Sequence, residues 1–179
     1  MKGPFRQAEG GEMRVTDNEL EYYIRHFRKN VYNAVLCYVR NPSDAEDITQ
    51  NTFFKLYTYT KSFNDDEHVK AWLLRCAINE CKNHLRSHWY RFSVPLESAK
   101  DMTCSDNTDH DDEMLGIMKK LSKNNRIALY MYYYEGYTIE EIGHILDVSS
   151  DTVSSRLHRG RQQLKKLLSE ERNGLFNEL

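Results

Sequence analysis

Residues 138–168, TIEEIGHILDVSSDTVSSRLHRGRQQLKKLL, contain two helical patterns separated by a tight turn. Thr138 stands three residues before Glu141, a capping-box spacing that predicts the start of a helix. Apolar residues then recur at helical spacing: Ile139, Ile142, Ile145 and Leu146. Gly143 permits close approach of the next helix, and Asp147 tolerates the left-handed backbone that such a turn needs. The pattern predicts a helix-turn-helix.

The second helix of this motif divides into an apolar stripe and a polar face. The predicted buried stripe consists of Val153, Leu157, Gly160, Leu164, Leu167 and Leu168. Residues of the opposite face are expected to read the DNA major groove: Asp151, Ser155, His158, Arg159 and Gln162. Three flanking residues are better placed for phosphates: Thr152, Ser154 and Arg156. A helical hairpin that binds another protein is the alternative, but the capping box, tight turn and basic outer face together favour DNA.

Charge is unevenly distributed along the chain of 179 residues, although its formal net charge is only −2. Residues 94–112 are strongly acidic and have little apolar periodicity, which predicts a flexible linker. We expect an all-α fold with two small helical domains, residues 17–93 and residues 113–170, the second containing the helix-turn-helix. Residues 1–16 are predicted to be a disordered tail and residues 171–179 a second tail.

The chain lacks an apolar segment long enough to span a bilayer and an N-terminal secretory signal, so the sequence predicts a cytoplasmic protein. Its four cysteines form no CxxC pair: Cys37, Cys76, Cys81 and Cys104. We therefore expect them to be reduced and structural.

Three helices are predicted in the first domain. Apolar residues recur at helical spacing from Leu20 to Tyr38, and the pattern stops at Asn41-Pro42. Ser43 and Glu46 have capping-box spacing and predict a second helix, to about Tyr59. A third pattern runs from about His68 to Tyr90.

The second helix has a face that its core does not explain. Ala45, Ile48 and Leu56 fall on one side. The other side carries Asp47, Gln50, Asn51 and Phe54. We interpret this face as a docking surface for a partner. The alternative is a solvent-exposed polar face that carries a single aromatic residue.

The third helix carries a narrow polar stripe between two apolar sides. Its members follow at spacings of four, three, four and four: Arg75, Asn79, Lys82, Arg86 and Tyr90. The cations suit phosphates, while Tyr90 and the adjacent Trp89 could stack on unpaired bases. An ordinary solvated stripe is the alternative reading.

The same helix contains Cys81, His84 and His88, at a spacing that could place metal ligands. No fourth ligand is placed by the sequence, so we expect no metal site and no cofactor. An enzyme built on these residues and on Asp109, His110 and Asp111 of the linker lacks a nucleophile and a pocket, and we expect no catalytic residue.

Three segments together resemble one family, the bacterial RNA polymerase sigma factors of the extracytoplasmic-function group. DAEDITQNTFFKLY (Asp44 to Tyr57) and VKAWLLRCAINECKNHLR (Val69 to Arg86) look like the family's second conserved region. LSKNNRIALYMYYYEGYTIEEIGHILDVSSDTVSSRLHRGRQQL (Leu121 to Leu164) looks like the fourth. The resemblance covers most of the chain, from Asp17 to Leu168.

The resemblance implies a factor that binds core RNA polymerase and promoter DNA and directs promoter-specific transcription initiation. It implies that Asp47, Gln50 and Phe54, with Asn51 on the same face, meet the polymerase clamp helices. The stripe through Arg75 to Arg86, with the loop Lys61 to Glu67, would engage the −10 element. The outer face of the last helix would read the −35 element, and an anti-sigma factor is an expected partner.

The main alternative is a transcription regulator that binds an operator through its helix-turn-helix and uses its first domain for dimerisation or sensing. Such a regulator would bind its site without polymerase. Co-purification with core RNA polymerase separates the two readings.

Overall fold

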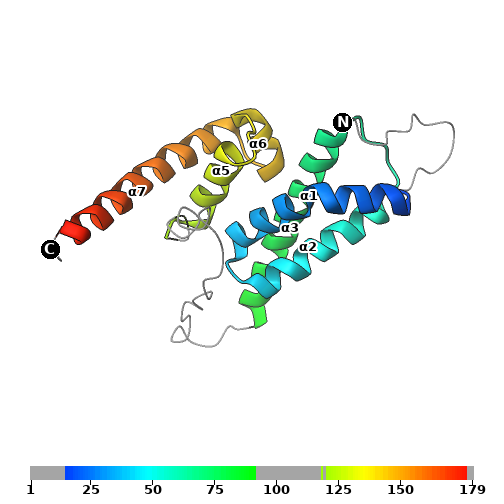
Figure 1. Ribbon diagram of the computed structural model, residues 1–179, viewed down its shortest axis with the longest axis horizontal. Coiled ribbons are helices and arrows are strands. Elements are labelled where there is room, and N and C mark those ends of the chain that lie inside the picture. Colours follow the sequence, from blue (N-terminus) through cyan, green and yellow to red (C-terminus); the bar gives the residue numbers. More distant parts are fainter. Residues whose placement is uncertain (1–14, 92–117, 119, 177–179) are drawn as a thin grey trace. The chain divides into compact units, whose positions relative to one another are not determined.

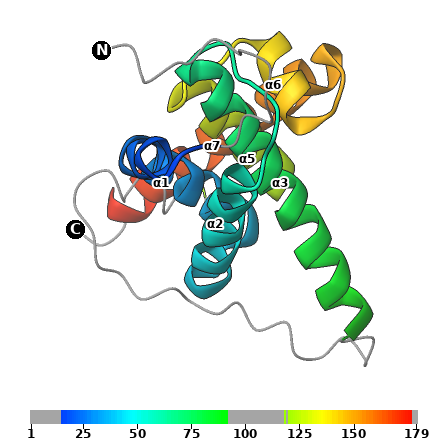
Figure 2. The same cartoon turned by 90° about the vertical axis from the view of Figure 1, so that its right-hand side faces the viewer.

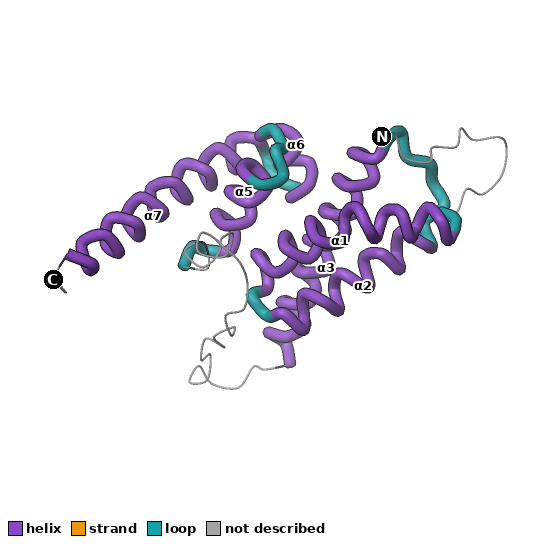
Figure 3. Tube along the Cα trace, in the orientation of Figure 1, coloured by secondary structure: helices purple, strands orange, loops and turns teal. Residues whose placement is uncertain are grey.

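The computed structural model describes residues 15–91, 118 and 120–176, with side chains left undescribed at 88–91 and 170–176. The chain divides into two compact units, residues 1–103 and residues 104–179. In the described residues the regular elements are helices, with no strand among them (Figure 3). The all-α, two-unit prediction is thus confirmed. The predicted linker at 94–112 lies outside the described residues.

The first unit is built from α1 (Asp17–Val39), α2 (Pro42–Tyr57) and α3 (Asp66–Arg91). Each of these helices packs against the other two (Figures 1 and 2). The core between them is apolar and contains Val31, Val35, Ala45, Leu56, Leu73, Leu74 and Ile78. Burial of these side chains drives the packing, because each buried valine, leucine or isoleucine side chain contributes about 1.5–3 kcal/mol.

The caps of α1 and α2 differ from those expected. Thr16, which we assigned to the tail, is the N-cap of α1 and forms a capping box with Glu19. The capping box predicted for α2 at Ser43 is wrong, because Asn41 is the N-cap and its side chain accepts from the backbone of Ser43 and Asp44. Pro42 occupies the first helical turn, where its missing N–H costs nothing.

The second unit contains α5 (Lys123–Tyr133), α6 (Ile139–Leu146) and α7 (Ser150–Phe176). Helix α7 packs against both α5 and α6. The predicted capping box at Thr138 is confirmed, and Ser149 accepts a hydrogen bond from the backbone N–H of Thr152 at the start of α7.

The turn between α6 and α7 has the predicted left-handed residue. Asp147 has φ 58° and ψ 56°, and its backbone N–H donates to the carbonyl of Gly143. The backbone N–H of Val148 donates to the same carbonyl at 3.0 Å. A Cβ at Gly143 would lie 2.9 Å from the Val148 carbonyl oxygen, so the turn requires glycine there. The helix-turn-helix prediction is confirmed in its geometry.

Helix α7 is longer than its neighbour, with 27 residues against 11 in α5. Residues 171–176, predicted as tail, continue this helix because the preceding residues are mostly strong helix formers. Val153, Leu157 and Gly160 are buried as expected, and Leu164 and Leu167 are half-buried. Leu168, predicted to be buried, is 44% exposed because it lines an open groove beside α5 and is not enclosed in the core.

Candidate nucleic-acid and protein interfaces

The outer face of α2 is exposed as the sequence predicted. Asp47, Gln50 and Asn51 are exposed polar residues, and the Phe54 side chain between them is 66% exposed. On the opposite side Ala45, Ile48, Thr49, Thr52, Phe53 and Leu56 are buried. Phe54 is therefore an exposed apolar side chain on an otherwise polar face.

Tyr57 is a further member of this face that the sequence analysis missed. It is 41% exposed and lies three residues after Phe54, so the two rings share one side of α2. Phe54 and Tyr57 are the two exposed large apolar side chains in the described part of the first unit. Their helical spacing is the signal in the sequence that could have found Tyr57, because it places Tyr57 beside Gln50 and away from Ala45 and Leu56.

The polar stripe of α3 is also on the surface. Arg75, Asn79 and Arg86 are exposed, whereas Lys82 is half-buried. Trp89 and Tyr90, expected to stack on bases, have side chains outside the described residues. The described stripe presents cations in one row along the helix, which suits a phosphate backbone.

An aromatic cluster fixes the loop that precedes α3. The rings of Tyr59 and Phe63 lie 4.6 and 5.7 Å from that of Trp72. His68 meets Phe63 edge-on at 5.3 Å, and its ring nitrogen Nδ1 accepts from the backbone N–H of Asn64 at 3.2 Å. These contacts hold the loop on the N-terminal end of α3, in line with the stripe.

In α3, Cys81 belongs to the packed core and His84 pairs with an acidic side chain of α2. Cys81 is fully buried, and this burial raises the pKa of its thiol to about 12. Nε2 of His84 lies 3.2 Å from the Asp44 carboxylate of α2. Among the residues that the structure describes, no group of three His, Cys, Asp or Glu side chains could hold a metal ion.

The outer face of α7 carries the predicted DNA-reading residues. Asp151, Ser155, His158, Arg159 and Gln162 are all exposed. Of the predicted phosphate contacts, Ser154 is exposed and Thr152 and Arg156 are half-buried. Gln162 and His158 lie in hydrogen-bond contact, 3.0 Å apart, so these two side chains form one polar surface.

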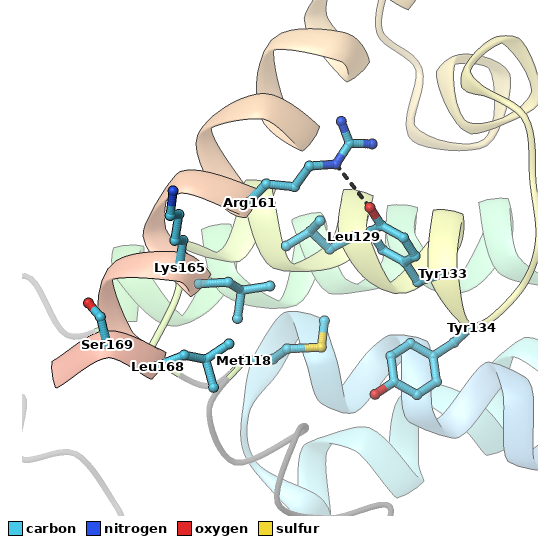
Figure 4. A pocket seen from close by; sticks show the side chains of 9 residues that line it. Met118, Leu129, Tyr133, Tyr134, Arg161, Lys165, Leu168 and Ser169 are labelled. Carbon is cyan, nitrogen blue, oxygen red and sulfur yellow. Dashed lines mark hydrogen bonds between the residues drawn. The ribbon is translucent and has the colours of Figure 1, made fainter. Parts of the chain in front are cut away.

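Arg161 does not join that surface. Its Nε donates to the Tyr133 hydroxyl of α5 at 3.0 Å (Figure 4). Its guanidinium lies over the rings of Tyr132 and Tyr133. It stands at one end of an apolar groove between α5 and α7. The groove is lined by Met118, Leu129, Tyr133, Tyr134, Arg161, Leu164, Lys165, Leu168 and Ser169.

Comparison with known proteins identifies both units. Residues 23–91 match Sigma-70 region 2, and residues 117–166 match Sigma-70 region 4. The ECF RNA polymerase sigma factor SigM of Bacillus subtilis (strain 168) is 30% identical over 147 residues, which cover 79% of this chain and 90% of that protein. The chain belongs to the ECF family of RNA polymerase sigma factors.

Other relatives agree with this assignment. The RNA polymerase sigma-H factor of Pseudomonas aeruginosa is 27% identical over 178 residues, covering 90% of each chain. The fold matches that of the sigma factor RpoE, solved in complex with the anti-sigma factor NepR from Bartonella quintana, with a TM-score of 0.66 at 20% identity. That match covers 85% of this chain and 98% of the other.

This sigma factor therefore binds core RNA polymerase and directs promoter-specific transcription initiation, which removes the alternative of a polymerase-independent regulator. None of the helices in the described part of the chain is long and apolar enough to cross a membrane.

Proposed function

We propose that three exposed faces of the protein make separate contacts during transcription initiation. The α2 face formed by Asp47, Gln50, Asn51, Phe54 and Tyr57 docks on core polymerase. The α3 stripe formed by Arg75, Asn79, Lys82 and Arg86, with residues 61–67 of the preceding loop and the first turn of α3, engages the −10 element, assisted by Trp89 and Tyr90. The outer face of α7 reads the −35 element. The protein contributes DNA binding and no catalytic residue of its own.

The observation that carries the docking assignment is the exposure of Phe54. A side chain 66% exposed on a well-packed helix adds nothing to the core, and its burial against a partner contributes about 1.5–3 kcal/mol. Polar and charged groups surround it on the same face, as the polar rim surrounds the apolar centre of many protein interfaces.

We also propose an anti-sigma factor as a regulatory partner. The sigma factor RpoE, which shares this fold at a TM-score of 0.66, was solved in complex with the anti-sigma factor NepR. CnrH, which shares it at a TM-score of 0.60, was solved in complex with the cytosolic domain of CnrY. We expect the site of action to be the cytoplasm, where promoter DNA lies.

The test of the docking face is the double variant Phe54→Ala with Asp47→Arg. We expect it to lose binding to core polymerase in a pull-down while its far-UV circular dichroism stays that of the parent, because both side chains point away from the core. The matched control is Glu21→Arg, a charge reversal of an exposed residue on α1. Normal core binding by the double variant would remove the docking assignment.

A further inference from the structure

A three-residue polar network joins α1 to the docking face of α2. Nη2 of Arg28 donates to both carboxylate oxygens of Glu46, at 2.6 and 2.7 Å. Nε2 of Gln50 donates to Oε1 of the same carboxylate at 3.1 Å. Glu46 therefore links a cation eighteen residues earlier in the chain to a residue of the proposed polymerase face.

The network fixes the orientation of the Gln50 amide. The hydrogen bonds from Gln50 and Arg28 lower the pKa of Glu46 below its ordinary value, so this carboxylate is ionised at neutral pH. An ionised carboxylate only accepts hydrogen bonds, so the amide nitrogen of Gln50 must face it. Within the part of the chain that the structure describes, the carbonyl oxygen of the exposed Gln50 has no hydrogen-bond donor and is open to one on a partner.

We propose that Arg28 and Glu46 are positioning residues for polymerase docking, which hold Gln50 so that its carbonyl oxygen meets a hydrogen-bond donor on the core enzyme. This inference rests on the proposed docking role of α2. Neither Arg28 nor Glu46 needs to touch the polymerase.

Positioning matters because a free glutamine side chain loses rotamer entropy when it is ordered in an interface. In this chain part of that loss occurs on folding, through the bond between Gln50 and Glu46. The Arg28–Glu46 pair is itself partly exposed, with side-chain exposures of 50% and 34%. A pair of this kind adds little to overall stability, so its removal should leave the fold intact.

The experiment is a double-mutant cycle on the full-length chain, measuring the Kd for core RNA polymerase. We expect Gln50→Ala to weaken binding about fivefold, the scale of one net hydrogen bond, and Glu46→Ala about threefold. If Glu46 acts through Gln50, the double variant should match Gln50→Ala alone. Independent effects would multiply to about fifteenfold, and that result would overturn the proposal.

Arg28 gives a second arm of the test. Arg28→Ala should weaken binding about twofold, and it should have no effect in a chain that already carries Glu46→Ala. Arg28→Lys should restore most of the binding, because in the structure a single nitrogen makes both contacts to the carboxylate. The matched control is Arg25→Ala, which breaks an exposed pair with Glu21 on the same helix and should leave Kd unchanged.

Failure of this inference can be told apart from failure of the docking assignment. If Phe54→Ala weakens core binding but Gln50→Ala and Glu46→Ala do not, the face docks and the positioning role is wrong. If Phe54→Ala also leaves binding unchanged, the docking face itself is wrong. Equal thermal midpoints for all variants are required. A Glu46→Ala variant with a lowered midpoint is replaced by Glu46→Leu, which fills a similar space but accepts no hydrogen bond.

Discussion

Gly143→Ala should destabilise the second unit although alanine favours helices. The added Cβ would lie 2.9 Å from the carbonyl oxygen of Val148, closer than carbon and oxygen tolerate. This oxygen belongs to the backbone of the turn, and the turn cannot shift freely. The backbone N–H groups of Asp147 and Val148 both donate to the carbonyl of Gly143 itself.

The size of the effect follows from two opposing contributions. Overpacking against a fixed backbone atom costs about 2–3 kcal/mol, whereas replacing a helical glycine by alanine gains about 1 kcal/mol. The net loss is about 1–2 kcal/mol in the free energy of unfolding. For a unit of this size that corresponds to a fall of about 5–15 °C in Tm.

Thermal unfolding of the full chain separates the two units. The two tryptophans, Trp72 and Trp89, both belong to the first unit, so their fluorescence follows that unit, while far-UV circular dichroism follows both. Only the dichroism should shift in Gly143→Ala. Ser154→Ala, at an exposed position of α7, is the control and should change stability by less than about 0.5 kcal/mol. An unchanged or raised midpoint for Gly143→Ala would refute the reasoning.

Three further predictions concern DNA reading, the tether and alkaline stability. Arg159→Ala should reduce the preference for one −35 sequence over its variants by about 1–3 kcal/mol, whereas Arg156→Ala should weaken the use of all sequences alike. A uniform loss in both variants, measured by transcription from a panel of promoters, would contradict these roles. Cutting the chain near Ser105 should leave two folded pieces whose mixture initiates transcription poorly, because tethering the second DNA contact raises the apparent affinity about a hundredfold. If the mixture initiates transcription as well as the intact chain, the tether is dispensable. Burial, with the nearby Asp66 carboxylate, raises the pKa of Tyr23 from 10.0 to about 12. Stability from Tyr23 should be complete below pH 10.0 and lost as pH rises towards about 12, and Tyr23→Phe should remove this loss in denaturation followed by tryptophan fluorescence.

Local patterns in the sequence predicted most of the helices and the helix-turn-helix. Thr138 and Glu141 are three residues apart, and Asp147 follows the last apolar residue of α6, so cap and turn depend on near neighbours in the chain. The outer faces of α2 and α7 could likewise be read from periodicity alone, because each helix has one continuous apolar side.

The sequence prediction for the start of α2 failed because two capping signals lie close together there. Ser43 and Glu46 have the spacing of a capping box, but Asn41 and Pro42 supply a cap and a first helical residue two positions earlier. Pro42 favours that start because its φ is already helical. The competing signal was present in the sequence, and only the backbone geometry showed which of the two the chain uses.

The tertiary structure decided what depends on residues far apart in the chain. Glu46 is bound by Arg28 because α1 packs against α2, and no spacing within either helix encodes that contact. Leu168 fits the apolar period of α7 yet is 44% exposed, because it lines an open groove beside α5 instead of a closed core. Periodicity tells which side of a helix is apolar, but burial also requires a neighbour, and its extent is set by packing of the whole unit.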